Sequence, residues 1–161
     1  MKAKTIVLTL AIVFVAASIY VVANPQLAAV KLHMGTWKLN ESKSKVPAGA
    51  VKNNTVVYEA SGDNIKVTVD GVDASGSAIH SEWTGKFDGK DYPVTGDPQA
   101  DMRAYRRVNA RTLTFTNKKG GKATVTGRVV VSRDGKSRTV TTTATDAQGK
   151  KITSTTVYDK Q

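Results

Sequence analysis

Residues 123–145 have the sequence ATVTGRVVVSRDGKSRTVTTTAT, and this stretch decides the fold class. Threonines occupy alternate positions after Asp134-Gly135, while the positions between them are mostly small or apolar. This is the two-residue period of a β-strand with one wet face. Asp-Gly supplies the backbone angles that a tight hairpin turn requires. The stretch therefore predicts two antiparallel strands, from Ala123 to Ser132 and from Ser137 to Thr145.

The same two-residue period continues toward both ends of the chain. Beyond Met34 no segment keeps a 3.6-residue apolar period for three turns, so helices are not expected there. Glycine turns such as Asp70-Gly71 and Gly120-Gly121 separate the apolar runs at roughly the 8–12-residue spacing of all-β domains. The further predicted strands are Thr36 to Leu39, Thr55 to Ala60, Ile65 to Asp70, Ile79 to Phe87, Tyr92 to Thr95, Arg103 to Val108, Leu113 to Thr116 and Ile152 to Asp159.

Strands joined by tight turns pair antiparallel, and a large sheet tends to close because closure removes its exposed edges. The predicted fold is all-β: an antiparallel up-and-down β-barrel of about eight to ten strands over residues 35–161, with 24–34 as a linker. The inward parity of the late strands holds small residues such as Gly127 and Ala144. Two alternatives stay open for the interior: a ligand cavity, or a flattened barrel filled by the larger side chains of the early strands.

Residues 1–23 have the pattern of an export signal. Two lysines precede a stretch from Ile6 to Ala23 that is apolar apart from three residues, and Asn24-Pro25 then ends any helix. We expect a signal helix that is cleaved after Ala23, and a protein that is exported to the periplasm or secreted. The alternative is an uncleaved membrane anchor, because about 18 apolar residues are just long enough to span a bilayer.

Composition excludes several classes of function. The 161 residues suit one domain, and the chain has a net charge of +11 and no cysteine, which excludes disulfides and thiolate sites. His33 and His80 are the only histidines and have no metal-ligand spacing, so we expect no metal and no cofactor. No nucleophile elbow or phosphate-binding loop occurs, so no catalytic residue is assigned. Nucleic acid is not an expected partner, and the protein is expected to be a monomer.

Both ends of the folded part resemble those of the calycins, the superfamily of lipocalins and intracellular fatty-acid-binding proteins. Gly35-Thr36-Trp37-Lys38-Leu39 matches their Gly-x-Trp signature, and Val157-Tyr158-Asp159-Lys160-Gln161 is similar to their last strand. Ser42-Lys43-Ser44-Lys45 and the segment from Lys86 to Pro98 resemble a group of uncharacterised exported bacterial proteins with a lipocalin-like domain. The resemblance covers nearly all of the mature chain. It implies a lipocalin-like barrel outside the cytoplasm, and no established activity.

The chain departs from these relatives in three places. Glu41 to Asn54 is too short for the pair of lid helices of fatty-acid-binding proteins. Thr156 stands where those proteins have an arginine for the carboxylate, so the resemblance does not imply fatty-acid binding. Lipocalins also stack a late arginine on the signature tryptophan, and here Arg138 and Arg128 are the candidates to replace it.

The candidate ligand contacts are one arginine and a set of aromatic side chains. Arg103, Arg106 and Arg107 share one strand, so at least one of them faces inward, and Arg106 is the candidate for an acidic ligand group. Alternatively, Arg106 pairs with a carboxylate or covers Trp37, and the aromatic residues only form the core. The candidate ligand-binding residues are Trp37, Tyr58, Trp83, Phe87, Tyr92, Arg106 and Tyr158.

Three functions follow as hypotheses. The first is an exported barrel that binds a small apolar or amphipathic molecule without catalysis. The second is an envelope interaction or structural module, with a filled barrel and one basic rim that attracts an anionic surface. The third is a cofactor-free isomerase, which needs an inward-facing acid and base. The residues of the predicted rim are Lys118, Lys119, Lys122, Arg133, Lys136, Lys150 and Lys151.

Overall fold

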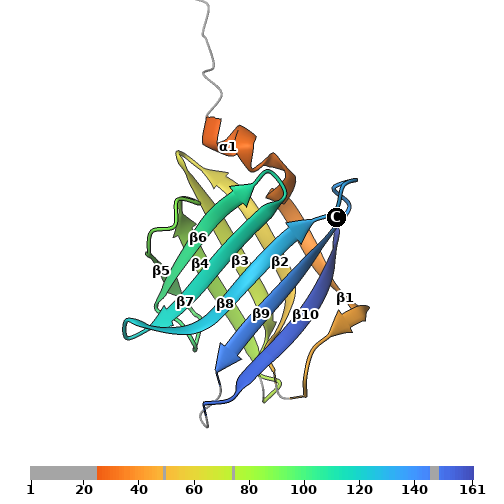
Figure 1. Cartoon of the computed structure of the whole chain (residues 1–161), viewed down its shortest axis with the longest axis vertical. Helices are drawn as coiled ribbons and strands as arrows, with labels where there is room; N and C mark the ends of the chain where they lie inside the picture. Colours follow the sequence, from red (N-terminus) through yellow and green to blue (C-terminus); the bar gives the residue numbers. More distant parts are fainter. Residues whose placement is uncertain (1–24, 49, 74, 146–148) are drawn as a thin grey trace, which may run out of the picture.

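The computed structural model is a closed barrel of ten antiparallel β-strands in meander order (Figure 1). It describes residues 25–48, 50–73, 75–145 and 149–161. Each strand pairs with its neighbours in sequence, and β1 pairs with β10 to close the sheet. The predicted all-β up-and-down barrel is thereby confirmed. The strands are β1 (Gly35–Lys45), β2 (Lys52–Ser61), β3 (Asn64–Val72), β4 (Ala78–Gly85), β5 (Tyr92–Thr95), β6 (Met102–Asn109), β7 (Thr112–Lys119), β8 (Lys122–Val131), β9 (Ser137–Thr145) and β10 (Lys151–Lys160).

The hairpin of β8 and β9 shows how local sequence sets the pairing. The Asp134 carboxylate accepts hydrogen bonds from the Ser132 hydroxyl (2.6 Å) and the Lys136 amide (3.0 Å), which fixes the turn. Val129 then lies opposite Val140, and both face the interior, whereas Thr139 and Thr141, which flank Val140 on β9, face outward. The predicted alternation of wet and inward faces is confirmed in this hairpin.

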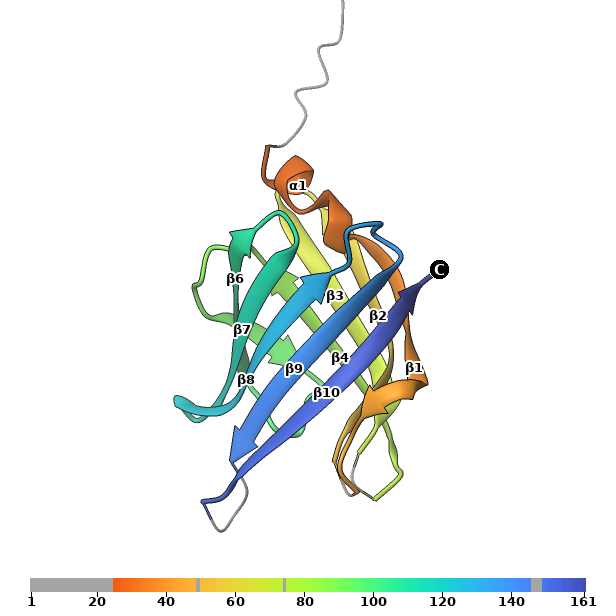
Figure 2. The ribbon, with the colours of Figure 1, turned by 45° about the vertical axis from the view of Figure 1, so that its right-hand side comes forward.

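One end of the barrel is covered by the helix α1 (Pro25–Ala29) and the 3-10 helix η1 (Lys31–His33), as Figures 1 and 2 show. Val30 is 2% exposed, His33 is fully buried, and the indole Nε1 of Trp37 donates to the His33 carbonyl oxygen at 2.9 Å. Gly35 has a φ of 99°, which lets the chain turn sharply from η1 into β1.

Residues 24–34 were expected to be a linker, and the structure corrects this for the part from Pro25 onward. This part is helical and packs Val30 and His33 against the barrel end. With five and three residues, these helices are too short to show a 3.6-residue apolar period in the sequence. Contacts with the barrel stabilise them, as expected for helices of this length. The predicted export signal at 1–23 lies outside the described residues. No helix in the described ranges has both the length and the apolar character to cross a lipid bilayer.

Consecutive turns of a meander lie at opposite ends of the barrel, and this divides the basic hairpin tips. The turn after β8, with Arg133 and Lys136, lies at the end that α1 covers, and Gly135 there approaches Leu32 of η1. The β7–β8 turn, with Lys119 and Lys122, lies at the other end, as does the start of β10 (Figure 1). The prediction of one basic rim that unites all these residues is therefore wrong.

The core has a filled part and a part that stays hollow. Trp37, Leu113 and Val131 are each completely buried and fill the barrel beside η1. Trp83 packs against Tyr105 with the ring centroids 4.9 Å apart, and its Nε1 donates to the carbonyl oxygen of Arg103 at 2.9 Å. These large side chains occupy the interior near α1, and the space toward the opposite end remains.

Candidate functional site

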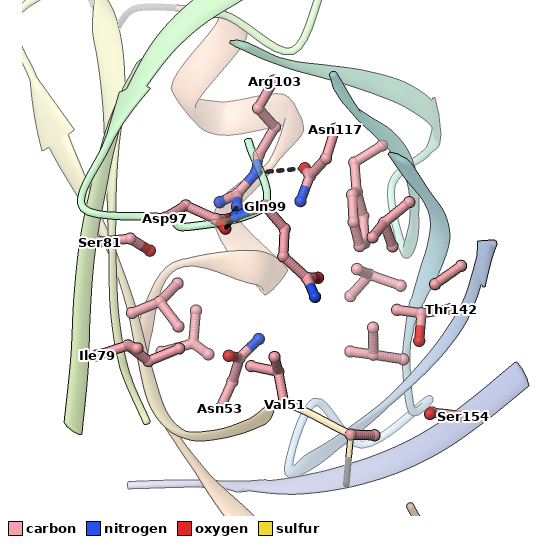
Figure 3. A pocket seen from close by; sticks show the side chains of 18 of the residues that line it. Val51, Asn53, Ile79, Ser81, Asp97, Gln99, Arg103, Asn117, Thr142 and Ser154 are labelled. Atoms are coloured by element: carbon pink, nitrogen blue, oxygen red, sulfur yellow. Dashed lines mark hydrogen bonds and ion pairs between the residues drawn. The ribbon is translucent and has the colours of Figure 1, made fainter. Parts of the chain in front are cut away.

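A cavity of about 300 Å³ lies inside the barrel, toward the end opposite α1 (Figure 3). Pro98, Gln99 and Thr145 line it and are exposed, so the cavity reaches the surface at that end. Of the two alternatives for the interior, the structure shows the cavity. Its apolar lining is Ala50, Val51, Val56, Val69, Ile79, Phe115, Val125, Val129, Val140, Ala144 and Ile152. Its polar lining is Asn53, Tyr58, Ser81, Asp97, Gln99, Arg103, Tyr105, Asn117, Arg138, Thr142, Thr145, Ser154 and Tyr158.

The cavity exists because the late strands contribute short inward side chains. Ala144 of β9 and Ser154 of β10 have short side chains that face the interior, whereas the inward side chains of the early strands are larger. Thr142 and Ser154 stand on one wall in Figure 3, and Ile79 stands on the opposite wall. Closing a ten-stranded barrel around such short side chains leaves space that the larger ones do not fill.

A network of polar side chains joins the β5–β6 loop to the barrel wall. The Arg103 guanidinium, whose residue is 6% exposed, donates to the Asp97 carboxylate at 2.8 Å and to the Asn117 side-chain oxygen at 2.7 Å (Figure 3). The Gln99 side chain extends from the same loop into the cavity, and the main-chain carbonyl oxygen of Gln99 accepts a hydrogen bond from the Thr124 hydroxyl at 3.0 Å. Arg103 thus has a counter-ion and a fixed orientation, which suits a structural role: it holds the β5–β6 loop against β7 at the cavity.

A second arginine lies deeper in the barrel. Arg138 is 2% exposed and lines the cavity at the start of β9, and its Cζ lies 4.9 Å from the ring centroids of Trp37, Tyr58 and Tyr158. Its Nε and Nη1 are buried and have no hydrogen-bond partner among the described residues. The resemblance-based expectation of an arginine on the signature tryptophan is confirmed for Arg138. Arg128 is exposed on the outer face.

Two phenols at the cavity, those of Tyr105 and Tyr158, are held in the neutral form. Burial, followed by the neighbouring Tyr58, raises the pKa of Tyr105 far above its usual value. Burial likewise raises the pKa of Tyr158. The hydroxyls of Tyr58 and Tyr105 lie 3.5 Å apart, at the outer limit of a hydrogen bond. Tyr105 and Tyr158 therefore offer hydroxyl groups and ring faces to a ligand, and no negative charge.

The structure divides the predicted aromatic residues into two groups. Tyr58 and Tyr158 line the cavity. Trp37 is buried behind Arg138, and Trp83 stacks on Phe87 with centroids 6.0 Å apart, away from the cavity lining. Tyr92, also outside that lining, is half-buried and donates its hydroxyl to the Asp88 carboxylate at 3.0 Å. Four of the six aromatic candidates therefore build the core and do not line the cavity.

Arg106 does not face the interior, and its interpretation as an inward-facing anchor is wrong. It is exposed and forms an isolated β-bridge with Asp88 on the outside, while Arg103 and Tyr105 on the opposite parity of β6 point inward. The alternation in the sequence did not decide between the two parities, because both carry an arginine. The ion pair between Arg103 and Asp97 decides which face of β6 points inward.

Sequence reasoning missed Arg138 as a residue of the cavity, although it named this side chain for another role. The available signal was an arginine at an inward position of a strand whose outward positions are threonines. His80 lies outside the barrel, where it contacts Asp70 at 2.6 Å, and His33 is buried beneath η1. Within the described ranges, no three His, Cys, Asp or Glu residues gather into a group that could hold a metal ion.

No protein-family model matches the chain, and no curated protein matches it. Among solved structures, the chain is similar to a redesigned β-barrel, mFAP1, bound to DFHBI, with 14% identity, a TM-score of 0.46 and coverage of 82% of this chain and 98% of that one. It is also similar to EF1p2_mFAP2b bound to DFHBI, with 10% identity, a TM-score of 0.46 and coverage of 86% and 100%. Neither likeness assigns a function to this chain.

Proposed function

We propose that this protein is an exported, lipocalin-like binding protein that holds a small apolar or amphipathic molecule inside its barrel and catalyses no reaction. The cavity of about 300 Å³ carries this proposal. Its walls combine apolar side chains with convergent polar groups, as small-molecule sites do. The volume equals that of about ten water molecules at about 30 Å³ each, which suits a compact ligand. Export is supported by the sequence pattern of residues 1–23.

The lining also favours binding over catalysis. Its acidic side chain, Asp97, already forms an ion pair with Arg103 at 2.8 Å. An isomerase without a cofactor needs an acid and a base that are free to exchange protons with the ligand. The Arg103 guanidinium occupies the Asp97 carboxylate, so this carboxylate is not free to contact a ligand as a base.

The alternative of a basic interaction module has weaker support. This alternative requires a filled barrel and a single positively charged rim. The basic residues Arg133 and Lys119 instead lie in hairpin turns at opposite ends of the barrel. The nearby Lys118 is also paired, with its Nζ 2.6 Å from the Asp91 carboxylate. The distribution of charge therefore favours the cavity as the functional feature.

The test compares two tryptophan substitutions on β9. Ala144→Trp places a large ring inside the cavity, whereas Thr141→Trp places the same ring on the exposed outer face. The probe is N-phenyl-1-naphthylamine (NPN), a neutral apolar dye whose fluorescence rises in apolar surroundings. We expect NPN to bind the unmodified protein and Thr141→Trp equally, and Ala144→Trp at least about tenfold more weakly.

Circular dichroism confirms in parallel that both variants are folded. If NPN binds Ala144→Trp as well as the unmodified protein, the cavity is not the binding site. If NPN does not bind the unmodified barrel at all, the proposed function is contradicted. Native mass spectrometry of protein purified from its own host then identifies the natural ligand as a co-purifying mass.

A further inference from the structure

We propose that the ligand of this cavity carries an anionic group, and that the guanidinium of Arg138 binds it at the inner end of the barrel. This inference rests on the ligand-binding function proposed above and adds the charge and the orientation of the ligand. The chemical class is a small anionic amphiphile, such as a carboxylate or a sulfonate with an apolar body.

The first observation is that the charge of Arg138 is not compensated within the described part of the chain. A guanidinium stays protonated in proteins, and a buried charge without a counter-ion is costly. None of the ion pairs among the described residues includes Arg138, and its Nε and Nη1 are buried without a partner. The side chain is only 2% exposed, so bulk water does not replace the missing acceptors.

The aromatic residues around Arg138 supply only part of what the guanidinium needs. Trp37, Tyr58 and Tyr158 each place a ring centroid 4.9 Å from its Cζ, and such cation–π contacts stabilise the positive charge. The N–H donors of a guanidinium lie in its plane and require oxygen acceptors, as the fork of a carboxylate or sulfonate provides. Burial also raises the pKa of Tyr158, so its hydroxyl remains neutral beside the arginine.

Arg103 provides an internal comparison within the same cavity. It is 6% exposed, and the chain supplies it with the Asp97 carboxylate at 2.8 Å and the Asn117 amide oxygen at 2.7 Å. The fold therefore equips one inward arginine with protein acceptors and leaves the other without them. An acceptor from a bound molecule completes the surroundings of Arg138.

The register of β9 gives the orientation of the ligand. Arg138 lies opposite Val131 and Tyr158 at the start of the strand, on the side of η1, and Ala144 lies six residues further toward the opening. Between these two levels the inward side chains of β9 that line the cavity are Val140 and Thr142. The anionic group therefore enters first, and the apolar body fills the space toward the cavity opening.

The test uses two dyes that share one ring system. NPN is neutral, whereas 8-anilinonaphthalene-1-sulfonate (ANS) adds a sulfonate to the same naphthylamine. We expect Arg138→Met to weaken the binding of ANS at least about tenfold, equivalent to about 1.4 kcal/mol, and to change the binding of NPN less than threefold. The matched control is Arg128→Met, which removes the same charge from the exposed outer face of the neighbouring strand and should change neither affinity.

A measurement on the unmodified protein covers the case in which Arg138→Met does not fold. The side-chain Nε–Hε resonance of Arg138 should shift when ANS saturates the barrel and stay in place with NPN, while that of Arg103 stays in place with both. An ANS affinity that does not depend on Arg138, or an unmoved Arg138 resonance in the ANS complex, overturns the inference while NPN binding still supports the proposed function. If neither dye binds, both proposals fall together.

Discussion

His33 should make the barrel sensitive to mild acid. Its imidazole is fully buried beside η1, and neither ring nitrogen has a hydrogen bond of good geometry among the described residues, although the Ala110 backbone partly opposes the lowering of the pKa of His33. Burial, and then the positive charges of Arg138 and Lys160, lower the pKa of His33 from 6.5 to about 4. The folded protein thus keeps this histidine neutral at a pH where the unfolded chain protonates it.

The sign and size of the effect follow from this difference. As the pH falls below 6.5, the unfolded state binds a proton that the folded state does not, so the free energy of unfolding decreases. The decrease continues until the folded state also protonates near pH 4. One pKa unit corresponds to about 1.36 kcal/mol, so the total loss is about 3 kcal/mol.

Urea unfolding at pH 7.5, 6.5, 5.5 and 4.5 measures this loss. We expect the unmodified protein to lose about 2–3 kcal/mol over this range, and His33→Leu, which has no titrating group there, to lose much less. Lowered pKa values also occur at the carboxyl groups of Asp73, Glu82, Asp88 and Asp134, whose contribution is lost mostly below pH 4.5 and equally in both proteins. Equal acid sensitivity in His33→Leu and the unmodified protein would refute the reasoning.

His80, the other histidine, is the natural control. Its exposed ring contacts Asp70 at 2.6 Å, and the hydrogen bond to that carboxylate raises the pKa of His80. A raised pKa acts in the opposite direction, because this contribution to stability is complete below pH 6.5 and is lost as the pH rises through the folded-state pKa. His80→Gln should therefore make the loss of stability on acidification steeper.

Two further substitutions, at Gly96 and Asp97, test the β5–β6 loop beside the cavity. Gly96 has a φ of 72°, and a Cβ there would collide with the His80 carbonyl oxygen, so Gly96→Ala should lower the free energy of unfolding by more than about 2 kcal/mol. Gly62→Ala, at a φ of 58° with open space around it, should cost about 1 kcal/mol, and equal urea midpoints for the two variants would contradict the collision. Asp97→Asn leaves the buried charge of Arg103 without its counter-ion and should cost about 3 kcal/mol in the same assay, whereas a cost below about 1 kcal/mol would show that the pair is dispensable.

The strand order was predictable because its signals are local. Alternating residues and glycine turns act within a few positions of each other, and the hairpin around Asp134-Gly135 formed as its sequence indicated. A chain of such hairpins has one simple way to remove its two free edges, which is to pair β1 with β10. The all-β class and the closed meander therefore follow from the order of residues.

The site was predictable only in part, because its key choices depend on residues distant in the sequence. Alternation divides β6 into two faces, but an arginine stands on each, and Asn117 of β7 together with Asp97 of the preceding loop draws Arg103 inward. Tyr58 and Tyr158, two of the candidate ligand contacts, line the cavity because they occupy inward positions of the two strands that flank β1, and their contact with a ligand stays a prediction.

The sequence by itself therefore determined the strands, their antiparallel neighbours and the face that each threonine-rich strand turns to water, since a two-residue period is a property of the backbone. Only the tertiary structure decided how much of the interior stays empty and which arginine lies uncompensated within it. Those outcomes depend on the volumes and charges that strands far apart in the chain bring to the same place, as β1, β2, β9 and β10 do around Arg138.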